Sequence, residues 1–514
     1  MNKNILSAFL LSFIALMGTA KSAVQVSHET KDVSIFIYYS GDNRLSDFMH
    51  SSYLRVLREG ASSNVNVVIQ FDGSAKNDSF RVELGSTKKN DHYEQTYYTK
   101  NVEYDMGKTQ TLADFVKWGK EKFPSKRTFL VISSHGFGIL NNPYPSNKNS
   151  TAASLASSID DTSHSFMAEE DMAQKLKVAL NGEKLDLLVH NSCLMGSLET
   201  LTIMSQIAKF AITSEYSIYM NTNDDLVSDE ARTILIERIV HQVKQNPKVT
   251  ELDIGRKVIA DFGVNYKNFQ APTDQQEAIR YPSTLAFYDL HLMPSLALLY
   301  SELTKMFREK ASLNNAIFTR FFDENLKARY VDNFGYIDLR SLYQSLMTSI
   351  YPGVVSEKMQ SFETLIQKVV PVSVELYTSQ TVPVAHLHAF FPSILTQADL
   401  KPFRQSYSEI STVQFYEWPL FLDFFWSGLE KNRDAYWIAK LQAWAGGATI
   451  IVKPTSDSSS YDYDLFLQLS MMAIRLKKIE GQAELKKYLL LLNSINRPSV
   501  DLRDHRNYVS QMLK

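Results

Sequence analysis

The chain has 514 residues, of which 44% are hydrophobic and 21% are charged, and its formal net charge is −2. This is ordinary globular composition, and the length suits two or three domains with a large buried core. The charge is nearly balanced and the sequence contains no long basic run. Electrostatics therefore give no reason to expect nucleic acid or an anionic membrane surface as a partner.

The first 20 residues have the pattern of a secretory signal peptide. Lys3 is followed by an apolar stretch at residues 5–17 and by the small residues Gly, Thr and Ala at 18–20. The apolar stretch is too short to span a bilayer comfortably, so cleavage is favoured over a membrane anchor. We expect a secreted or periplasmic protein with no membrane span after signal removal.

Buried strands and amphipathic helices alternate through the next two hundred or so residues. Continuous apolar runs predict strands at 33–39, 65–71, 128–134, 185–190 and 210–214. Helical spacing predicts helices ending at 59 and spanning 111–123, 169–180 and 196–207. Alternation predicts a hairpin at 79–105, and Ser, Asn and Pro predict a loop at 141–158. This order predicts an α/β fold with a mostly parallel sheet and helices on both faces.

From about residue 230 the pattern becomes mainly helical. We expect helices at 230–263, 287–309, 338–350, 355–370, 434–446, 463–477 and 482–493. Strands are expected at 284–288, 371–378 and 384–391, with a short apolar run at 448–452. The predicted organisation is a signal peptide at 1–20, an α/β domain at 24–230, an α+β region at 231–430 and a helical extension at 431–514.

Cys193 is the only cysteine, so the chain cannot form an internal disulfide. In an exported protein an odd thiol indicates a reactive group or intermolecular pairing, and a buried structural cysteine is the alternative. Cys193 follows the apolar run at 185–190 and precedes an expected helix opening at 194–196. His135 follows the run at 128–134. Both side chains should lie at the carboxyl edge of a parallel sheet, where such folds bind ligands.

These two side chains suit nucleophilic catalysis. A helix beginning at Cys193 would lower the pKa of the thiol, and His135 could serve as acid and base. The backbone amides of Gly136 and Cys193 could form an oxyanion hole. The pattern predicts a cysteine hydrolase, with peptidase activity favoured.

Two motifs resemble those of a known family. Residues 134–138, SHGFG, resemble the His-Gly segment of the clostripain-like cysteine peptidases, and residues 191–199, NSCLMGSLE, resemble their Cys-Leu-Met-Gly-x-x-Glu segment. Residues 35–45, 65–73 and 106–115 resemble further family segments, so the likeness covers about 33–430. The resemblance implies a caspase-like fold in which residues 24–230 form the catalytic domain. It also implies a His/Cys dyad, a protein or peptide substrate and no required cofactor.

The sequence departs from the family at the substrate pocket. Family members commonly carry an aspartate at the position of Asn191, where it pairs with Arg or Lys of the substrate. Glu215, in a weaker match at 213–215, is assigned with Asn191 to this pocket. Asp224 or Asp225 could supply a substitute charge, although a solvated acidic turn is the better interpretation.

Other polar residues have competing interpretations. His190 is interpreted as a strand-end residue rather than the catalytic base. His386 and His388 have spacing that suits a metal, but a half-exposed strand face is favoured, and no metal site is assigned. The pair Asp160 and Asp161 resembles a family feature that could bind calcium or order the loop, with a solvated turn equally acceptable.

Two functional expectations remain. The first is an exported cysteine endopeptidase, whose self-processing would be expected at Lys148, although an uncut surface loop is favoured there. The alternative is a secreted binding or scaffold protein that keeps the peptidase fold without turnover, an option that Asn191 leaves open.

Overall fold

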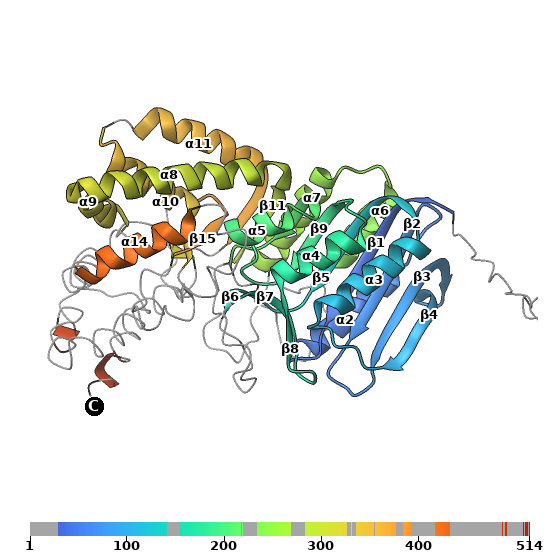
Figure 1. The fold of residues 1–514 in the computed structure, drawn as a ribbon. Helices are drawn as coiled ribbons and strands as arrows, with labels where there is room; N and C mark the ends of the chain where they lie inside the picture. Colours follow the sequence, from blue (N-terminus) through green and yellow to red (C-terminus); the bar gives the residue numbers. More distant parts are fainter. Residues whose placement is uncertain are drawn as a thin grey trace, which may run out of the picture.

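The computed structural model describes residues 29–140, 154–216, 218, 234–268, 283–325, 330–331, 336–353, 355–376, 384–391 and 417–431, with single positions after 485. Its centre is a sheet that, within these ranges, has nine strands in the order β14-β11-β10-β9-β5-β1-β2-β3-β4 (Figure 1). The expected signal peptide and the elements expected between 434 and 482 lie outside the described residues, and the helix expected at 482–493 has only single described positions.

Five neighbouring strands form the parallel centre of the sheet. β1 (Lys31–Ser40) pairs with β2 (Val65–Asp72) and with β5 (Ser125–Ser133). β9 (Leu185–Asn191) pairs with β5 and with β10 (Ala208–Thr213), also in parallel. Their continuous apolar runs are buried on both faces, as parallel strands require. The predicted mostly parallel, caspase-like α/β fold is confirmed.

Antiparallel strands extend both edges of this centre. On one edge, β3 (Ser79–Lys89) and β4 (His92–Val102) form the hairpin that alternation predicted. On the other edge, β11 (Ser283–Asp289) pairs with β10, and β14 (Val372–Leu376) pairs with β11. Strands from beyond residue 230 therefore continue the same sheet.

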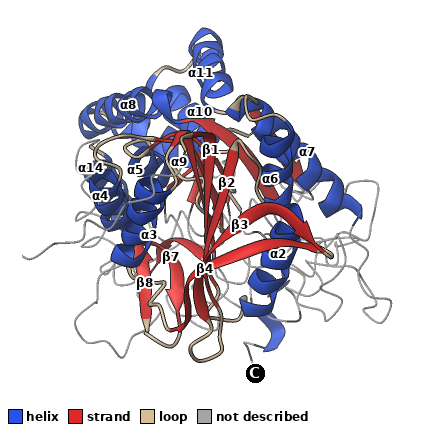
Figure 2. Ribbon diagram, turned by 90° about the vertical axis from the view of Figure 1, so that its right-hand side faces the viewer, coloured by secondary structure: helices blue, strands red, loops and turns tan. Residues whose placement is uncertain are grey.

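Helices cover both faces of the sheet, as Figure 2 shows. Alternate residues of β1 point to opposite layers: the Phe36 ring meets Phe115 edge-on with centroids 5.9 Å apart, whereas the Tyr39 hydroxyl lies 3.0 Å from Ser52 Oγ. One face carries α2 (Ser46–Glu59), α6 (Ile236–Gln245) and α7 (Glu251–Asn268). The other carries α3 (Thr109–Lys122), α4 (Glu169–Ala179), α5 (Leu198–Met204) and α8 (Met293–Leu313).

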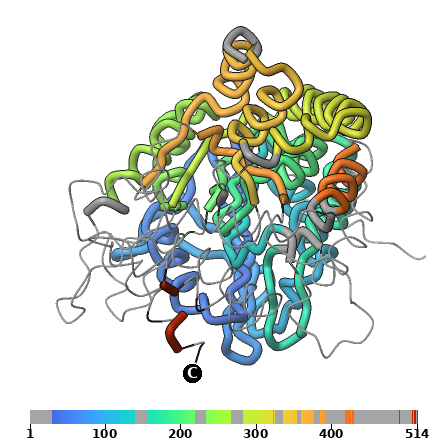
Figure 3. Tube along the Cα trace, turned by 90° about the vertical axis from the view of Figure 1, so that its left-hand side faces the viewer, coloured from blue at the N-terminus to red at the C-terminus, as the bar shows by residue number. Residues whose placement is uncertain are grey.

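The later elements lie at the end of the molecule away from the β3–β4 hairpin (Figure 1), and they form the yellow and orange tube in Figure 3. The helical elements are η1 (Leu290–Leu292), α9 (Asn315–Asn325), α10 (Leu339–Ile350), α11 (Val355–Val369) and α14 (Trp418–Lys431). A small sheet contains β12 (Tyr330–Val331), β13 (Tyr336–Asp338) and β15 (His388–Phe390). The mainly helical character expected after residue 230 is confirmed. In the part of the chain that is described, no helix is both long and apolar enough to cross a membrane.

Three local expectations are wrong. The helix expected at 230–263 is two helices, α6 and α7, separated by residues 246–250. The region expected to be a loop at 141–158 ends in a strand, because β6 (Gly136–Leu140), β7 (Ser154–Asp160) and β8 (Ser165–Ala168) form a second small sheet. The sequence did not predict this strand because β7 has the polar composition of a loop. The helix expected to open at 194–196 begins instead at Leu198, because Leu194 has a φ of 59° and Ser197 caps α5 by accepting from the Thr200 N–H.

Candidate active site

The two candidate catalytic side chains leave neighbouring parallel strands at the same height. β5 and β9 end at Ser133 and Asn191, and these two residues are directly paired in the register. His135 and Cys193 each follow two residues later. The equal extension of two adjacent strands therefore delivers imidazole and thiol to one edge of the sheet.

Gly136 brings the two loops into backbone contact. A Cβ added to Gly136 would overlap the Cys193 carbonyl oxygen and would lie 2.8 Å from Ser192 Cβ and 3.0 Å from Cys193 N. Only a residue without a side chain fits this approach. The two backbone segments assigned to the oxyanion hole are thus packed directly against each other.

His135 is held as a neutral imidazole in this conformation. The ring is 8% exposed and stacks on Phe137 with centroids 5.6 Å apart. Arg44 Nε donates to His135 Nε2 over 3.4 Å. Burial, and to a smaller extent the Arg44 charge, lower the pKa of His135 to about 4, while Asp161 opposes the change. A neutral ring can accept a proton as a base, and only after it has done so can it donate that proton to the leaving group as an acid.

The Cys193 thiol receives an N–H donor from the segment after β10. The Ile218 N–H lies 3.1 Å from Cys193 Sγ, and the Ile218 carbonyl oxygen lies 3.7 Å from the same sulfur. The Leu194 N–H donates to the Tyr216 carbonyl over 3.3 Å. Because α5 begins only at Leu198, no helix starts at Cys193, and the expected effect of a helix dipole on the thiol is absent. The Ile218 N–H is the donor close to the sulfur instead.

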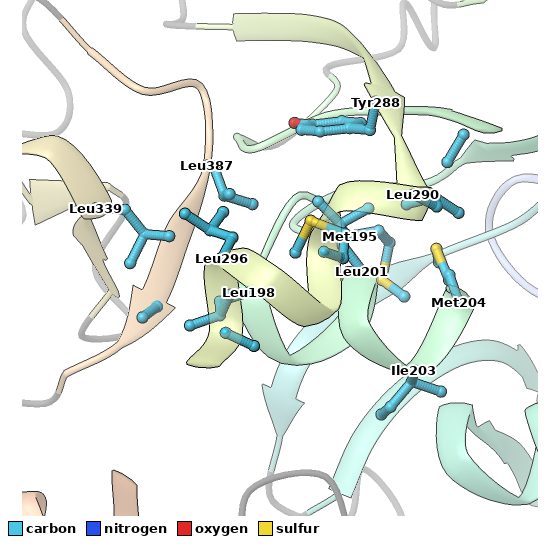
Figure 4. Close-up of a cluster of buried hydrophobic side chains, with 14 of the residues drawn as sticks. Met195, Leu198, Leu201, Ile203, Met204, Tyr288, Leu290, Leu296, Leu339 and Leu387 are labelled. Carbon is cyan, nitrogen blue, oxygen red and sulfur yellow. The ribbon is translucent and has the colours of Figure 1, made fainter. Parts of the chain in front are cut away.

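The later part of the chain packs against the segment that follows Cys193, as the buried side chains in Figure 4 show. The Gly196 carbonyl accepts from the His388 N–H over 3.2 Å, and Glu199 Oε1 accepts from the Phe390 N–H over 3.0 Å. This contact gives the glutamate of the NSCLMGSLE motif a structural role. Apolar side chains complete the packing: Met195, Leu198, Leu201, Tyr288, Leu290, Leu296, Leu339 and Leu387.

Asn191 and Glu215, the residues assigned to the substrate pocket, are both buried here. Asn191 is 0% exposed and its Nδ2 donates to Ser133 Oγ over 2.9 Å. Glu215 is 1% exposed and packs against Gly196, where an added Cβ would lie 3.0 Å from Glu215 Cα. The two residues lie at the correct edge of the sheet, but their pocket role stays a prediction. Lys148, Asp224 and Asp225 lie outside the described residues.

Two other histidines considered from the sequence, His190 and His388, lie in the core. His190 is fully buried on β9, and its Nε2 lies 3.6 Å from Glu169 Oε1. His388 is also fully buried, with its ring centroid 4.4 Å from that of Tyr336, and burial lowers its pKa to about 3. His386 precedes β15 and has a φ of 53°. The expectation that His386 and His388 share a half-exposed strand face is therefore wrong.

Asp160 orders a loop. Its side chain is fully buried, Oδ2 accepts from the Met106 N–H over 2.8 Å, and Oδ1 accepts from the Ser163 N–H over 2.7 Å. Burial raises the pKa of Asp160 to about 6, and the two N–H donors oppose that change. Of the two roles that the Asp160–Asp161 pair suggested, these bonds fit the ordering of the loop.

Three other carboxylates lie close enough together to hold a cation. Ligand atoms of Asp42, Asp72 and Glu103 lie within 4.8 Å of one another. Asp72 is 0% exposed; its Oδ1 accepts from Ser79 Oγ, and its Oδ2 has no hydrogen-bond partner among the described residues. Burial and the surrounding carboxylates, those of Asp160 and Glu103 among them, raise the pKa of Asp72 to about 8. Three carboxylates suit a hard cation such as Ca²⁺.

A family model places the chain among known proteins. The model of the clostripain family matches residues 37–370, which include both the His135 and the Cys193 motifs. The chain belongs to the clostripain family. The predicted resemblance is confirmed, and membership places the chain among the cysteine peptidases.

Solved structures share the fold at low sequence identity. A secreted C11 cysteine protease from Bacteroides thetaiotaomicron, "iotapain", is 14% identical with a TM-score of 0.52; the match covers 75% of this chain and 99% of that one. An inactive zymogen C11 protease from Parabacteroides distasonis is 17% identical with a TM-score of 0.50; the match covers 76% of this chain and 99% of that one. A secreted C11 cysteine protease from Bacteroides thetaiotaomicron in complex with an irreversible peptide inhibitor is 15% identical with a TM-score of 0.52; the match covers 77% of this chain and 99% of that one. No curated protein matches the chain.

Proposed function

We propose that this clostripain-family protein is an exported cysteine endopeptidase in which Cys193 is the nucleophile and His135 is the acid and base. The observation that carries the proposal is the contact at Gly136, which joins the loops of the two side chains. The N-terminal signal pattern and the secreted relative support export to the periplasm or the exterior.

The proposed reaction has two halves. Neutral His135 takes the proton of Cys193, and the sulfur forms a bond to the scissile carbonyl carbon. The oxygen of that carbonyl becomes negative and accepts from the Gly136 and Cys193 amides. The C–N bond then breaks as His135 returns the proton to the leaving amine. In the second half, water loses a proton to His135 and its oxygen attacks the thioester carbon. The C–S bond then breaks, the acid product leaves, and His135 returns the proton to the sulfur.

Substrate choice is proposed to depend on Asn191 and Glu215. A protein or peptide is the expected substrate, in keeping with the peptide inhibitor bound to the Bacteroides relative. Asn191 accepts hydrogen bonds but lacks the charge of an aspartate, so preference for Arg or Lys should be weak at this position. Both residues are buried, so a substrate side chain would reach them only after local rearrangement. Cleavage after Lys148 stays a prediction.

No cofactor is needed for the proposed chemistry, but we propose that Asp42, Asp72 and Glu103 bind Ca²⁺. The support is the short separation of their ligand atoms and the buried, unpaired Oδ2 of Asp72 in the described structure. Asp42 precedes Asn43 and Arg44, and Arg44 contacts His135. A bound cation would fix this turn beside the catalytic ring.

The second candidate is a secreted binding protein without turnover. Asn191 favours this candidate, because a pocket with an amide in place of a carboxylate cannot form a charge-assisted hydrogen bond with Arg or Lys and binds these residues more weakly. The inactive zymogen among the similar structures has the same fold, so fold alone does not separate the two candidates.

The decisive test is hydrolysis of a diverse peptide library by purified protein. Wild type should cleave internal peptide bonds, and Cys193→Ala should have no activity because the acyl intermediate cannot form. His135→Ala should lose at least about 10²-fold, the low end for lost acid–base catalysis. Circular dichroism should show both variants folded. A wild type that binds peptides without cleaving them would favour the second candidate.

A further inference from the structure

A group of polar side chains is buried behind the candidate active site. Ser157 on β7, Glu169 at the start of α4 and His190 on β9 are each 0% exposed. None of them belongs to the proposed catalytic machinery. They lie on the α3–α4 side of the sheet, where most neighbouring side chains are apolar.

Few contacts offset the burial of these polar atoms. Ser157 Oγ donates to Glu169 Oε1 over 2.5 Å, and the same oxygen lies 3.6 Å from His190 Nε2. Glu169 Oε2 and both ring nitrogens of His190 have no hydrogen bond to any residue that the structure describes. Burying polar groups with so few partners is unfavourable, and an apolar pair of similar size is often as stable or more stable. A role other than stability would explain why these residues are polar.

The position of the group suggests that role. Ser157 is paired with Gly136 across β6 and β7, and the neighbouring Ser158 N–H donates to the His135 carbonyl oxygen over 3.0 Å. On the other side, His190 is the residue before Asn191, which ends β9 on the way to the Cys193 loop. Glu169 therefore contacts both Ser157 and His190 and links the two sides.

We propose that Glu169 and His190 are positioning residues that fix the cysteine loop relative to the histidine loop. This inference rests on the proposed peptidase function, since it concerns the geometry of the same dyad. Ser157 is fixed relative to β6 and His135, and His190 is fixed relative to β9 and Cys193. Glu169 contacts both residues, so it holds the two strands in a defined relative position. None of the three touches the substrate, and each acts through the backbone of its strand or helix.

An electrostatic role at the helix end is the competing explanation for Glu169. Carboxylates in a first helical turn stabilise the helix. Glu170 and Asp171 occupy the same turn, and the Asp171 carboxylate accepts from Thr109 and Lys175. The helix end is thus supplied with acidic residues, and Glu169 alone is turned into the core toward Ser157.

The test compares substitutions that keep or remove the oxygen of Glu169. Glu169→Gln keeps an oxygen acceptor for Ser157, whereas Glu169→Met keeps the length and loses it. We expect kcat of Glu169→Met to fall at least about 10-fold with KM within about threefold, because small displacements of reacting groups act on the chemical step. Glu169→Gln should keep kcat within about fivefold. Asp171→Asn, on the same helical turn, is the matched control and should leave both constants unchanged.

A double substitution separates positioning from stability. Glu169→Met with His190→Leu replaces both polar partners by apolar groups, so its urea midpoint should equal or exceed that of the single Glu169→Met variant. Its kcat should stay low, because the polar bridge is still missing. Recovery of kcat together with stability would show that the pair only stabilises the fold and would overturn the inference, as would wild-type kcat in Glu169→Met.

The rate of Cys193 alkylation by iodoacetamide gives a readout that needs no substrate. We expect Glu169→Met to change this rate at least about threefold, since the thiol no longer has the same placement relative to His135. Wild-type hydrolysis that disappears in Cys193→Ala establishes the peptidase function separately. If wild type has no turnover, the proposed function fails, and an unchanged alkylation rate in Glu169→Met still refutes positioning.

Discussion

Substitution of Gly136 by alanine should separate the two catalytic loops. The added Cβ would overlap the Cys193 carbonyl oxygen and lie 2.8 Å from Ser192 Cβ. Carbon atoms pack at about 3.5 Å or more, so the Ser192 contact alone requires one loop to move by roughly 0.7 Å, and the overlap with the Cys193 carbonyl oxygen requires a larger movement. The obstacle is backbone, which cannot rotate aside as a flexible side chain would. We expect a loss of about 1–3 kcal/mol in the free energy of unfolding, as for other overpacked sites.

The effect on activity should be larger than the effect on stability implies. A displacement of about 1 Å between reacting groups can reduce the rate by about 10²-fold, so a loss of roughly 30- to 100-fold in kcat is expected. The assays are peptide hydrolysis for kcat and KM, and urea unfolding for stability. Both should be measured on protein purified at the same temperature and pH.

Gly182→Ala is the matched control. Gly182 has a φ of 79°, so alanine there is strained by about 1–2 kcal/mol, but its Cβ would meet nothing within 4 Å. It follows α4, away from the dyad, and should lose stability while keeping kcat. If Gly136→Ala behaves like Gly182→Ala, with lower stability and full activity, the contact between the loops has no catalytic importance.

Three further predictions concern the surroundings of the dyad. Asn191→Asp should raise cleavage after Arg or Lys, because it places a carboxylate beside the expected pocket; an unchanged preference across a peptide library would remove Asn191 from the pocket. Arg44→Met should raise the pKa of His135 from about 4 by roughly one pH unit, the effect of an exposed charge 3.4 Å away, and NMR titration of the ring should detect it. Because the pKa of folded His135 lies below that of an unfolded histidine, wild type should lose stability as the pH falls from about 6.5 toward 4, and Arg44→Met should lose less. Calorimetry should show one Ca²⁺ bound per wild-type chain and none bound by Asp72→Asn, with Asp114→Asn, at an exposed position of α3, as control. An absence of binding to wild type would refute the site.

The central sheet and the approximate place of the dyad could be predicted from sequence for a simple reason. The strands β1, β2, β5 and β9 are continuous apolar runs, which only a sheet covered on both faces accommodates. Parallel strands then bring their carboxyl ends to one edge, so His135 and Cys193 had to be near each other if β5 and β9 were neighbours. The sequence did not reveal that Ser133 and Asn191 are directly paired, which makes the two extensions equal.

Features that depend on contacts between distant segments could not be predicted. Glu169 and His190 approach each other only because the fold brings the start of α4 to the end of β9, and neither residue has a distinctive local pattern. Asp42, Asp72 and Glu103 come from a turn, a strand end and the segment after a hairpin, so no spacing rule links them. The start of α5 was misjudged because Leu194 and Met195 have the apolar character of a helix but lie buried in a turn.

The most direct test of the account is covalent labelling of the dyad by a peptidyl acyloxymethyl ketone pool with varied residues at the site of attack. Intact-protein and peptide mass spectrometry would measure how many labels bind and where. The account predicts one label per chain on Cys193, blocked by prior iodoacetamide, slowed in His135→Ala and absent in Cys193→Ala. A folded wild type that cleaves peptides but carries no label on Cys193, or a Cys193→Ala variant that still cleaves them, would contradict it.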